Sequence, residues 1–306
     1  MERTKSFRNE YLRKKFEENY LKIMPSFFEM QSTFLSGIYK RYGDLEGGNI
    51  VIFFARDLHL QILRKREINL DFDLSLEKFW INHKNIVQGK QKIIIVSKQT
   101  GLPKETARRK ILHLIKKKHI KKGEKNRLFW EPASDHKETY IKIIDEQINS
   151  LSRFVFEQTK CINLNVPVSK IEKEIKKNYC FYWYNYLTAQ LEYISFWQKR
   201  LKDLEMLLIV FQVVIQTIKI KESKNSSPDI SATSISEITG IPRATCIRKL
   251  DRFVKMKVLE KNLQSKRYSL FVGKNNHNEF INPQSMSDKV SLFSDFSSTI
   301  INALQK

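Results

Sequence analysis

The sequence predicts a mainly α-helical protein with small β-hairpins, organised as two tandem copies of one module. Three observations lead to this prediction: turn-forming residues are scarce, two pairs of stretches align within the chain, and each copy carries a helix–turn–helix pattern. The 306 residues include only nine glycines and seven prolines, too few for the many turns of a β-sandwich or barrel. A hydrophobic share of 41 % is enough for packed cores, and the length suits about two domains.

The charge of the chain points to a polyanionic partner. Lysine and arginine together number 55 against 33 acidic residues, giving a formal net charge of +22. Nucleic acid is the first expectation for such an excess and an anionic membrane surface the second. The most apolar run, residues 206–218, is too short to cross a bilayer and contains two glutamines, so it predicts a buried helix and no membrane span.

The remaining composition favours the reducing cytoplasm and argues against a metal site. The N-terminal segment is charged throughout and has no apolar stretch, so we expect no secretory signal. The three cysteines form no C-x-x-C pair and have no histidine cluster beside them, which predicts neither a zinc site nor a disulfide framework. We therefore expect a cytoplasmic protein without a metal or cofactor.

Two internal alignments indicate that the chain is a tandem duplication. Residues 34–51 align with 193–210 at an offset of 159, and eight of the aligned positions are identical. Residues 101–106 align with 240–245 at an offset of 139, sharing a glycine, a proline and a threonine. The offsets differ by 20, which predicts an insertion in the first copy around residues 64–91. We expect an N-terminal module at 1–132 and a C-terminal module at 133–306.

The first copy reads as a short helix, a turn, a second helix and a hairpin, within about residues 44–131. Residues 96–100 predict the short helix, Gly101 the turn, and Pro103 the first position of the next helix. A strand is expected from Ile120 and its partner over 127–130. The apolar positions of the second helix have the four-three-one spacing of a single face: Ala107, Ile111, Leu114 and Ile115.

The second copy repeats this order within about residues 203–272. Residues 203–220 predict a buried helix that is apolar nearly all round. Ser234 and Glu237 have the spacing of a capping box, which predicts a helix start at Ile235. Gly240 would end this helix, and Pro242 would open the next. That next helix repeats the apolar spacing with Cys246, Leu250, Phe253 and Val254, and the hairpin strands are expected at 258–259 and 267–270.

Further helices are expected outside these segments. Residues 27–42, 139–158 and 181–201 are rich in aromatic side chains and predict long helices. Such aromatic stripes more often form a core than a ligand pocket. Residues 285–304 predict an amphipathic C-terminal helix with Val290, Phe293, Ile300 and Leu304 inward.

These patterns resemble the winged helix–turn–helix of bacterial transcriptional regulators. Residues 235–261 are most similar to the MarR type, in which a Gly-Leu-Ser-Arg-x-Thr turn precedes an Arg-Leu-x-x-Leu helix. Pro242 stands here where serine is usual, and Lys257 where a glycine often closes the helix. The resemblance implies a sequence-specific, DNA-binding transcriptional regulator. Because MarR-type proteins act as homodimers, the resemblance also implies a pseudo-dimer whose central interface is formed by residues 27–42, 139–158 and 181–201. The C-terminal helix would close this pseudo-dimer or join two chains, so the protein is expected as a monomeric pseudo-dimer or as a further homodimer of whole chains. A small-molecule effector is a secondary expectation.

The charge is concentrated where this resemblance places double-stranded DNA. Residues 103–127 carry a net +9 and residues 242–267 a net +7, together 16 of the 22 net charges. Side chains at the start of a recognition helix reach base edges in the major groove, while basic hairpins contact phosphates. The candidate DNA-binding residues are Lys104, Glu105, Thr106, Arg108, Arg109, Lys125 and Arg127 in the first copy, and Arg243, Ala244, Thr245, Arg248, Lys249, Lys266 and Arg267 in the second. Because the two helices differ, we expect an asymmetric operator.

Other functional classes remain open at this point. The sequence lacks the phosphate-binding, zinc-protease and serine-hydrolase motifs, so we expect no enzyme. A plasmid-type replication initiator with two winged-helix domains is one alternative, and a non-specific nucleoid-associated protein is another. His113 and His119 are expected to face phosphate or solvent.

Overall fold

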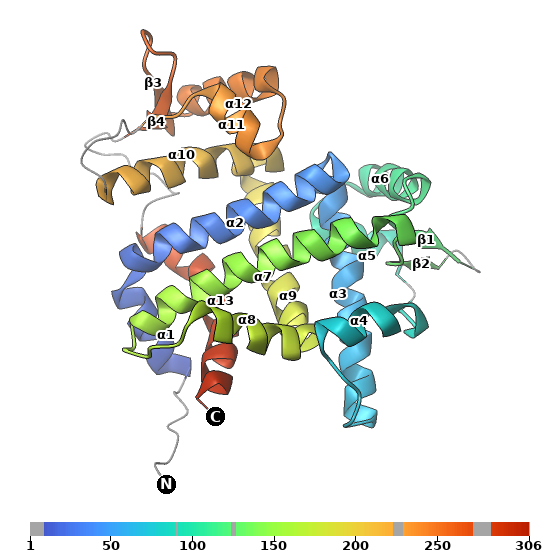
Figure 1. Cartoon of the computed structure of the whole chain (residues 1–306). Coiled ribbons are helices and arrows are strands. Elements are labelled where there is room, and N and C mark those ends of the chain that lie inside the picture. Colours follow the sequence, from blue (N-terminus) through green and yellow to red (C-terminus); the bar gives the residue numbers. More distant parts are fainter. Residues whose placement is uncertain (1–8, 90, 124–126, 223–228, 272–282, 306) are drawn as a thin grey trace.

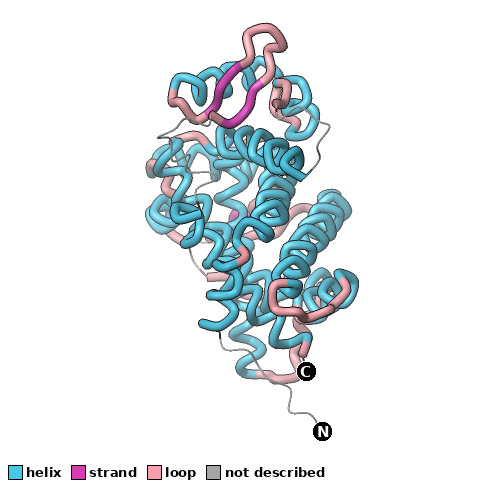
Figure 2. Tube along the Cα trace, turned by 90° about the vertical axis from the view of Figure 1, so that its left-hand side faces the viewer, coloured by secondary structure: helices cyan, strands magenta, loops and turns pink. Residues whose placement is uncertain are grey.

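The computed structural model describes residues 9–89, 91–123, 127–222, 229–271 and 283–305, without the side chains of 219–222 and 283–291. It is mainly helical with two small antiparallel hairpins (Figures 1 and 2), as the sequence predicted. The first helices are α1 (Asn9–Glu18), α2 (Tyr20–Tyr42), α3 (Leu45–Ile68), α4 (Leu76–Asn82), α5 (Ile93–Thr100), α6 (Lys104–Lys116) and α7 (Lys137–Lys160). The later ones are α8 (Val168–Lys177), α9 (Tyr179–Leu201), α10 (Leu204–Glu222), α11 (Ala232–Thr239), α12 (Arg243–Lys255) and α13 (Pro283–Leu304). Short 3-10 turns cover His83–Asn85 and Ser134–His136.

Each hairpin follows one of the two shorter helix pairs. Strands β1 (Lys121–Lys122) and β2 (Leu128–Phe129) form the first, with Lys121 opposite Phe129. Strands β3 (Leu259–Lys261) and β4 (Tyr268–Leu270) form the second, with Leu259 opposite Leu270. The first hairpin is shorter than the sequence suggested, and the strands of the second differ from the expected bounds by one or two residues.

The element bounds repeat at the two offsets found in the sequence. Helices α1, α2 and α3 begin at residues 9, 20 and 45, while α8, α9 and α10 begin at 168, 179 and 204, each 159 residues later. Helices α5 and α6 span 93–100 and 104–116, and α11 and α12 span 232–239 and 243–255, each 139 later. This correspondence supports the duplication. The expected insertion includes α4, which has no counterpart among the described residues between α10 and α11.

The order of the elements places the junction between the copies later in the chain than the sequence predicted. Helix α7 follows the first hairpin as α13 follows the second, and α8 corresponds to α1. The first copy therefore includes α7, and the copies meet between Lys160 and Val168 rather than at 132/133. The expected boundary came too early because α7 lies outside both aligned stretches.

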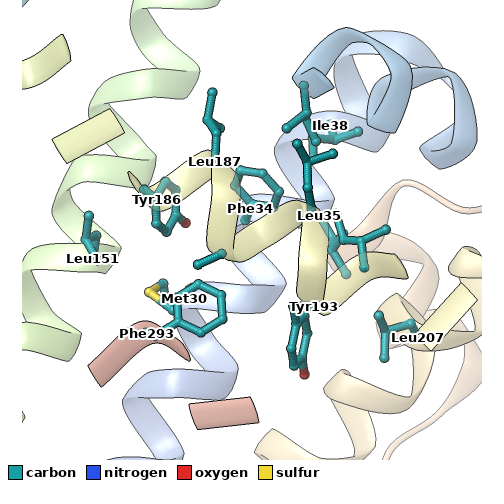
Figure 3. Packing of buried hydrophobic residues seen from close by; sticks show 14 of the residues in the cluster. Met30, Phe34, Leu35, Ile38, Leu151, Tyr186, Leu187, Tyr193, Leu207 and Phe293 are labelled. Carbon is teal, nitrogen blue, oxygen red and sulfur yellow. The ribbon is translucent and has the colours of Figure 1, made fainter. Parts of the chain in front are cut away.

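The core is made by helices exchanged between the copies. Helix α3 packs against α9, and its counterpart α10 packs against α2. Helix α7 packs against α2 and α8, while α13 packs against α9 and α1. Buried side chains from α2, α7, α9, α10 and α13 meet at the centre (Figure 3), as the aromatic stretches predicted. Phe293, Ile300 and Leu304 are buried as predicted, and the Val290 side chain lies outside the described ones.

Helix α10 is buried on all sides over residues 206–214, as its composition predicted. Every residue from Met206 to Phe211 is 0 % exposed. The polar Gln212 in this helix donates a hydrogen bond to Ser32 Oγ across the core, which satisfies a group that would be costly to bury alone. Among the described residues, no helix has the length and apolarity needed to span a membrane.

Three local expectations were wrong. Helix α11 is capped by Ser231, whose side chain accepts from the Ser234 backbone N–H. Helix α11 begins at Ala232, three residues before the predicted start at Ile235. It can begin here because the extended segment that pairs Ile230 with Tyr268 ends just before the cap. The prolines lie at the cap position immediately before α6 and α12. His119 is 6 % exposed, packed beside the first hairpin instead of facing solvent.

Candidate nucleic-acid interface

Two helix–hairpin units carry the candidate residues. We define the first unit as α3, α5, α6 and β1–β2, and the second as α10, α11, α12 and β3–β4. In both, the turn before the exposed helix contains a left-handed glycine, Gly101 (φ 72°) or Gly240 (φ 78°). Ser97 Oγ donates to the Leu102 carbonyl, and Ser236 Oγ donates to the Ile241 carbonyl. The same bonds therefore fix the turn in each unit.

A lysine in each unit ties the exposed helix to the scaffold helix beneath it. Lys110 Nζ lies 2.6 Å from Asp44 Oδ2 and 3.1 Å from Glu46 Oε2, at the N-terminus of α3. Burial disfavours its ammonium, but these carboxylates raise the pKa of Lys110. Lys249 makes the equivalent ion pairs with Asp203 and Glu205. Each pair of carboxylates also lies at a helix N-terminus, where negative charge is favourable.

The prediction that Lys249 contacts DNA does not fit this geometry. Its side chain is only 8 % exposed and points to α10. Sequence reasoning placed it with the outer basic residues because it follows Arg248. A signal for its true role was present: the acidic pair at 44/46 recurs at 203/205, and Lys110 recurs as Lys249.

The other candidates are accessible to different degrees. The exposed ones are Lys104, Glu105, Arg108, Arg109 and Arg127 in the first unit and Arg243, Ala244, Arg248 and Lys266 in the second. Thr106, Thr245 and Arg267 are half-buried. Lys125 lies outside the described residues.

Some of these side chains have partners within their own unit. Arg267 Nε lies 2.8 Å from Asp229 Oδ1, so part of its guanidinium holds the base of the second hairpin. Arg243 Nε donates to Thr233 Oγ1 at the start of α11. Arg109 and Arg248 are equivalent, exposed positions that leave a cation on the outer face of each helix.

Figure 1 shows the second unit at the top of the molecule and α6 at its upper right. Hairpin β3–β4 lies to the left of α12, and hairpin β1–β2 lies below α6 on the right. Each half of the molecule therefore presents an exposed helix, α6 or α12, with a hairpin beside it.

Each unit rests on the long helix of the other copy. Helix α5 packs against α9, and α11 packs against α2. A Cβ added at Gly101 would lie 3.7 Å from Gln198 Cγ, and one at Gly240 would lie 3.9 Å from Lys40 Cγ. The relative position of the two exposed helices is therefore set by contacts that cross between the copies.

Two hollows adjoin these units. A cavity of about 70 Å³ between α2, α3, α7 and α9 is lined mainly by apolar and aromatic side chains, and it is far smaller than the ~300–1,000 Å³ of ordinary ligand pockets. A groove of about 560 Å³ lies between α2, α7 and the second unit, lined by polar residues that include Ser36, Lys40, Arg153 and Gln212. Of these two hollows, the groove has the size of a small-molecule site.

Comparison with known proteins finds no relative. No family model matches the chain, and neither the curated proteins nor the solved structures contain a significant match. Within the part of the chain that the structure describes, no group of three or more histidine, cysteine or acidic side chains is placed to hold a metal ion. A function for the chain is therefore inferred from its own geometry.

Proposed function

We propose that the chain is a sequence-specific, double-stranded-DNA-binding transcriptional regulator whose helix–hairpin units act as MarR-like winged helix–turn–helix modules. The observation that carries the proposal is that each unit presents an exposed basic helix, α6 or α12, followed by a hairpin. A duplex that contacts both units would meet both helices in its major groove and both hairpins at its phosphates.

The matched charges of the two helices support this proposal. At the offset of 139, Lys104 corresponds to Arg243, Arg109 to Arg248 and Lys116 to Lys255, and all six residues are exposed. Solubility alone requires no such matching. Two helices with matched basic positions suit a ligand whose negative charge repeats along its length, as it does in duplex DNA.

A binding titration with labelled genomic duplexes tests the proposal. Substituting Arg109→Ala and Arg248→Ala together should lower affinity by about tenfold or more, since each arginine contributes a charge-assisted contact. Lys142→Ala, at an exposed position on α7, is the matched control and should bind as the unaltered chain does. If about eight phosphates are neutralised, log affinity should fall with log salt at a slope of about −7. Unchanged binding by the double variant would contradict the proposal.

Footprinting on genomic DNA separates this proposal from its alternatives. A regulator protects single sites near promoters, a plasmid-type initiator protects an array of direct repeats, and a nucleoid-associated protein protects no defined site. The groove beside the second unit is the proposed place for an effector, because a ligand there would contact both α2 and α11.

A further inference from the structure

The outer faces of α6 and α12 can be compared position by position, because the two helices occupy equivalent places. Three positions in their first turns keep the same chemistry: Lys104 and Arg243 are basic, Thr106 matches Thr245, and Arg109 matches Arg248. Two positions differ completely. Glu105 corresponds to Ala244, and Arg108 corresponds to Ile247. These two positions are three residues apart, so they lie side by side on the helix.

In the first unit the two differing residues form an ordered pair. Arg108 Nη2 donates to Glu105 Oε1 at 2.7 Å, and its Nε lies 3.0 Å from Oε2. The side chains are 52 % and 75 % exposed, so the pair stands on the surface. Arg108 uses the Nε and Nη2 edge of its guanidinium for the carboxylate, which leaves the donors on Nη1 for another acceptor.

In the second unit the same place has no polar side chain. Ala244 is exposed, and Ile247 is half-buried against the core of its unit. Methyl groups replace both the carboxylate and the guanidinium. The neighbouring cations, Arg243 and Arg248, are retained and exposed. The two units thus differ in the side chains they present at these two positions, while the neighbouring cations that can contact phosphates are the same in kind.

The major groove distinguishes these two surfaces. An ionised carboxylate only accepts hydrogen bonds, and the donors offered there are the cytosine N4 and adenine N6 amino groups. A guanidinium edge matches guanine O6 and N7. Alanine and isoleucine can do neither, but their methyl groups pack against the thymine C5 methyl. A thymine in the first half-site would offer Glu105 no donor beyond Arg108, which is unfavourable for a desolvated charge.

We infer that the two units read half-sites of unlike base composition: Glu105 and Arg108 select adjacent cytosine and guanine, whereas Ala244 and Ile247 select thymine. This inference rests on the proposed DNA binding and makes it specific. It assigns Glu105, Arg108, Ala244 and Ile247 as the specificity-determining residues. Arg109 and Arg248 then supply affinity that is the same in both halves.

Selection from randomised duplexes by the purified full-length chain tests the inference. The unaltered protein should enrich a site with one half containing cytosine and guanine and one half rich in thymine. The variant Glu105→Ala/Arg108→Ile gives the first helix the chemistry of the second, and it should enrich two thymine-rich halves. The reciprocal variant, Ala244→Glu/Ile247→Arg, should enrich two halves containing cytosine and guanine. Replacing cytosine and guanine in the first half-site should weaken wild-type binding by about 5- to 150-fold.

The outcomes separate this inference from the proposal beneath it. Thermal denaturation first checks that each variant is folded, and the Glu105→Ala/Arg108→Ile variant alters only exposed side chains. If duplexes are bound but the enriched halves are alike, or do not change in the variants, the inference is wrong and DNA binding stands. If no duplex is bound by the unaltered chain, the proposed function itself fails.

Discussion

Lys110 and Lys249 each join an exposed helix to two carboxylates at the start of a buried one. Their surroundings differ in degree, since the Lys249 side chain is 8 % exposed and that of Lys110 is 19 % exposed. Removing a lysine would leave Asp and Glu side chains repelling each other beneath a helix. The loss is greatest where water is most excluded, because desolvated charges depend most on their partners.

We predict that Lys249→Ala lowers the free energy of unfolding by about 1–2 kcal/mol, less than for a fully buried pair because its partners are about a quarter exposed. Lys110→Ala should cost less than Lys249→Ala. Urea denaturation measures both. If the Lys249→Ala variant had normal stability but weakened DNA binding, Lys249 would be a DNA-contacting residue and its structural role would be contradicted.

Buried histidines give the fold a dependence on pH. His59 is 2 % exposed and stacks on Phe79 at 4.9 Å between ring centroids. Burial lowers its pKa to about 3, and burial together with nearby cations such as Arg41 lowers the pKa of His119 to about 4. The unfolded chain binds these protons below about pH 6.5, so stability is complete above that pH and falls as the pH drops.

The variant His59→Ile removes one of these two titrating groups. Isoleucine is chosen because the equivalent position 159 residues later is the buried Ile218. Between pH 7.5 and pH 5.5, His59 should account for about 1.4 kcal/mol of lost stability. The variant should therefore lose about that much less over the same interval. Denaturation curves at the two pH values measure it, and an equal loss in both proteins would show that His59 is not buried as described.

At the scale of elements, the turns before α6 and α12 depend on glycine. Gly101 and Gly240 both have positive φ, a conformation that is unfavourable for any residue with a Cβ. No clash arises at either place, since the nearest side-chain atoms would be 3.7 Å and 3.9 Å from the added Cβ. The expected penalty is therefore that of the backbone alone.

We predict that Gly101→Ala and Gly240→Ala each destabilise the chain by about 1 kcal/mol. The two values should agree closely because the turns have the same bonds and similar φ angles. As a control, Gly43→Ala tests another left-handed glycine, at the end of α2, with open space around it. Thermal or chemical denaturation gives the values. A stabilising effect at Gly101 or Gly240 would contradict the turn geometry.

For the whole molecule, the exchanged packing makes each copy depend on the other. The apolar faces of α3 and α10 are covered by α9 and α2, which belong to opposite copies. Neither half alone has a partner for these faces, and exposed apolar patches of that extent drive association. The molecule should therefore fold as one cooperative unit.

We predict that fragments 1–164 and 165–306 are separately insoluble or self-associated, and that they form a one-to-one complex when produced together. Sedimentation analysis measures the stoichiometry, and circular dichroism measures the recovered helix content. The intact chain is the control. Two stable, well-folded monomeric fragments would contradict the interlocked arrangement.

Much of the local structure could be predicted from the sequence, because it depends on near neighbours. The 3.6-residue spacing located α6 and α12, Gly101 and Gly240 marked their turns, and the apolar composition of α10 indicated its burial. The start of α11 was missed because two serines compete as its cap, and the choice depends on Ile230 pairing with Tyr268, 38 residues away. Both hairpins were predicted in the correct places, but the first was predicted too long.

The sequence by itself determined the helical class, the repeated element order and the clustering of positive charge, since all three follow from composition and spacing. Only the tertiary structure decided which lysine is buried, where the copies divide, and which helices of opposite copies pack together. The physical reason is that these features depend on contacts between residues far apart in the chain. Helices exchanged between the copies fix them, and no local pattern encodes the partner against which a helix will pack.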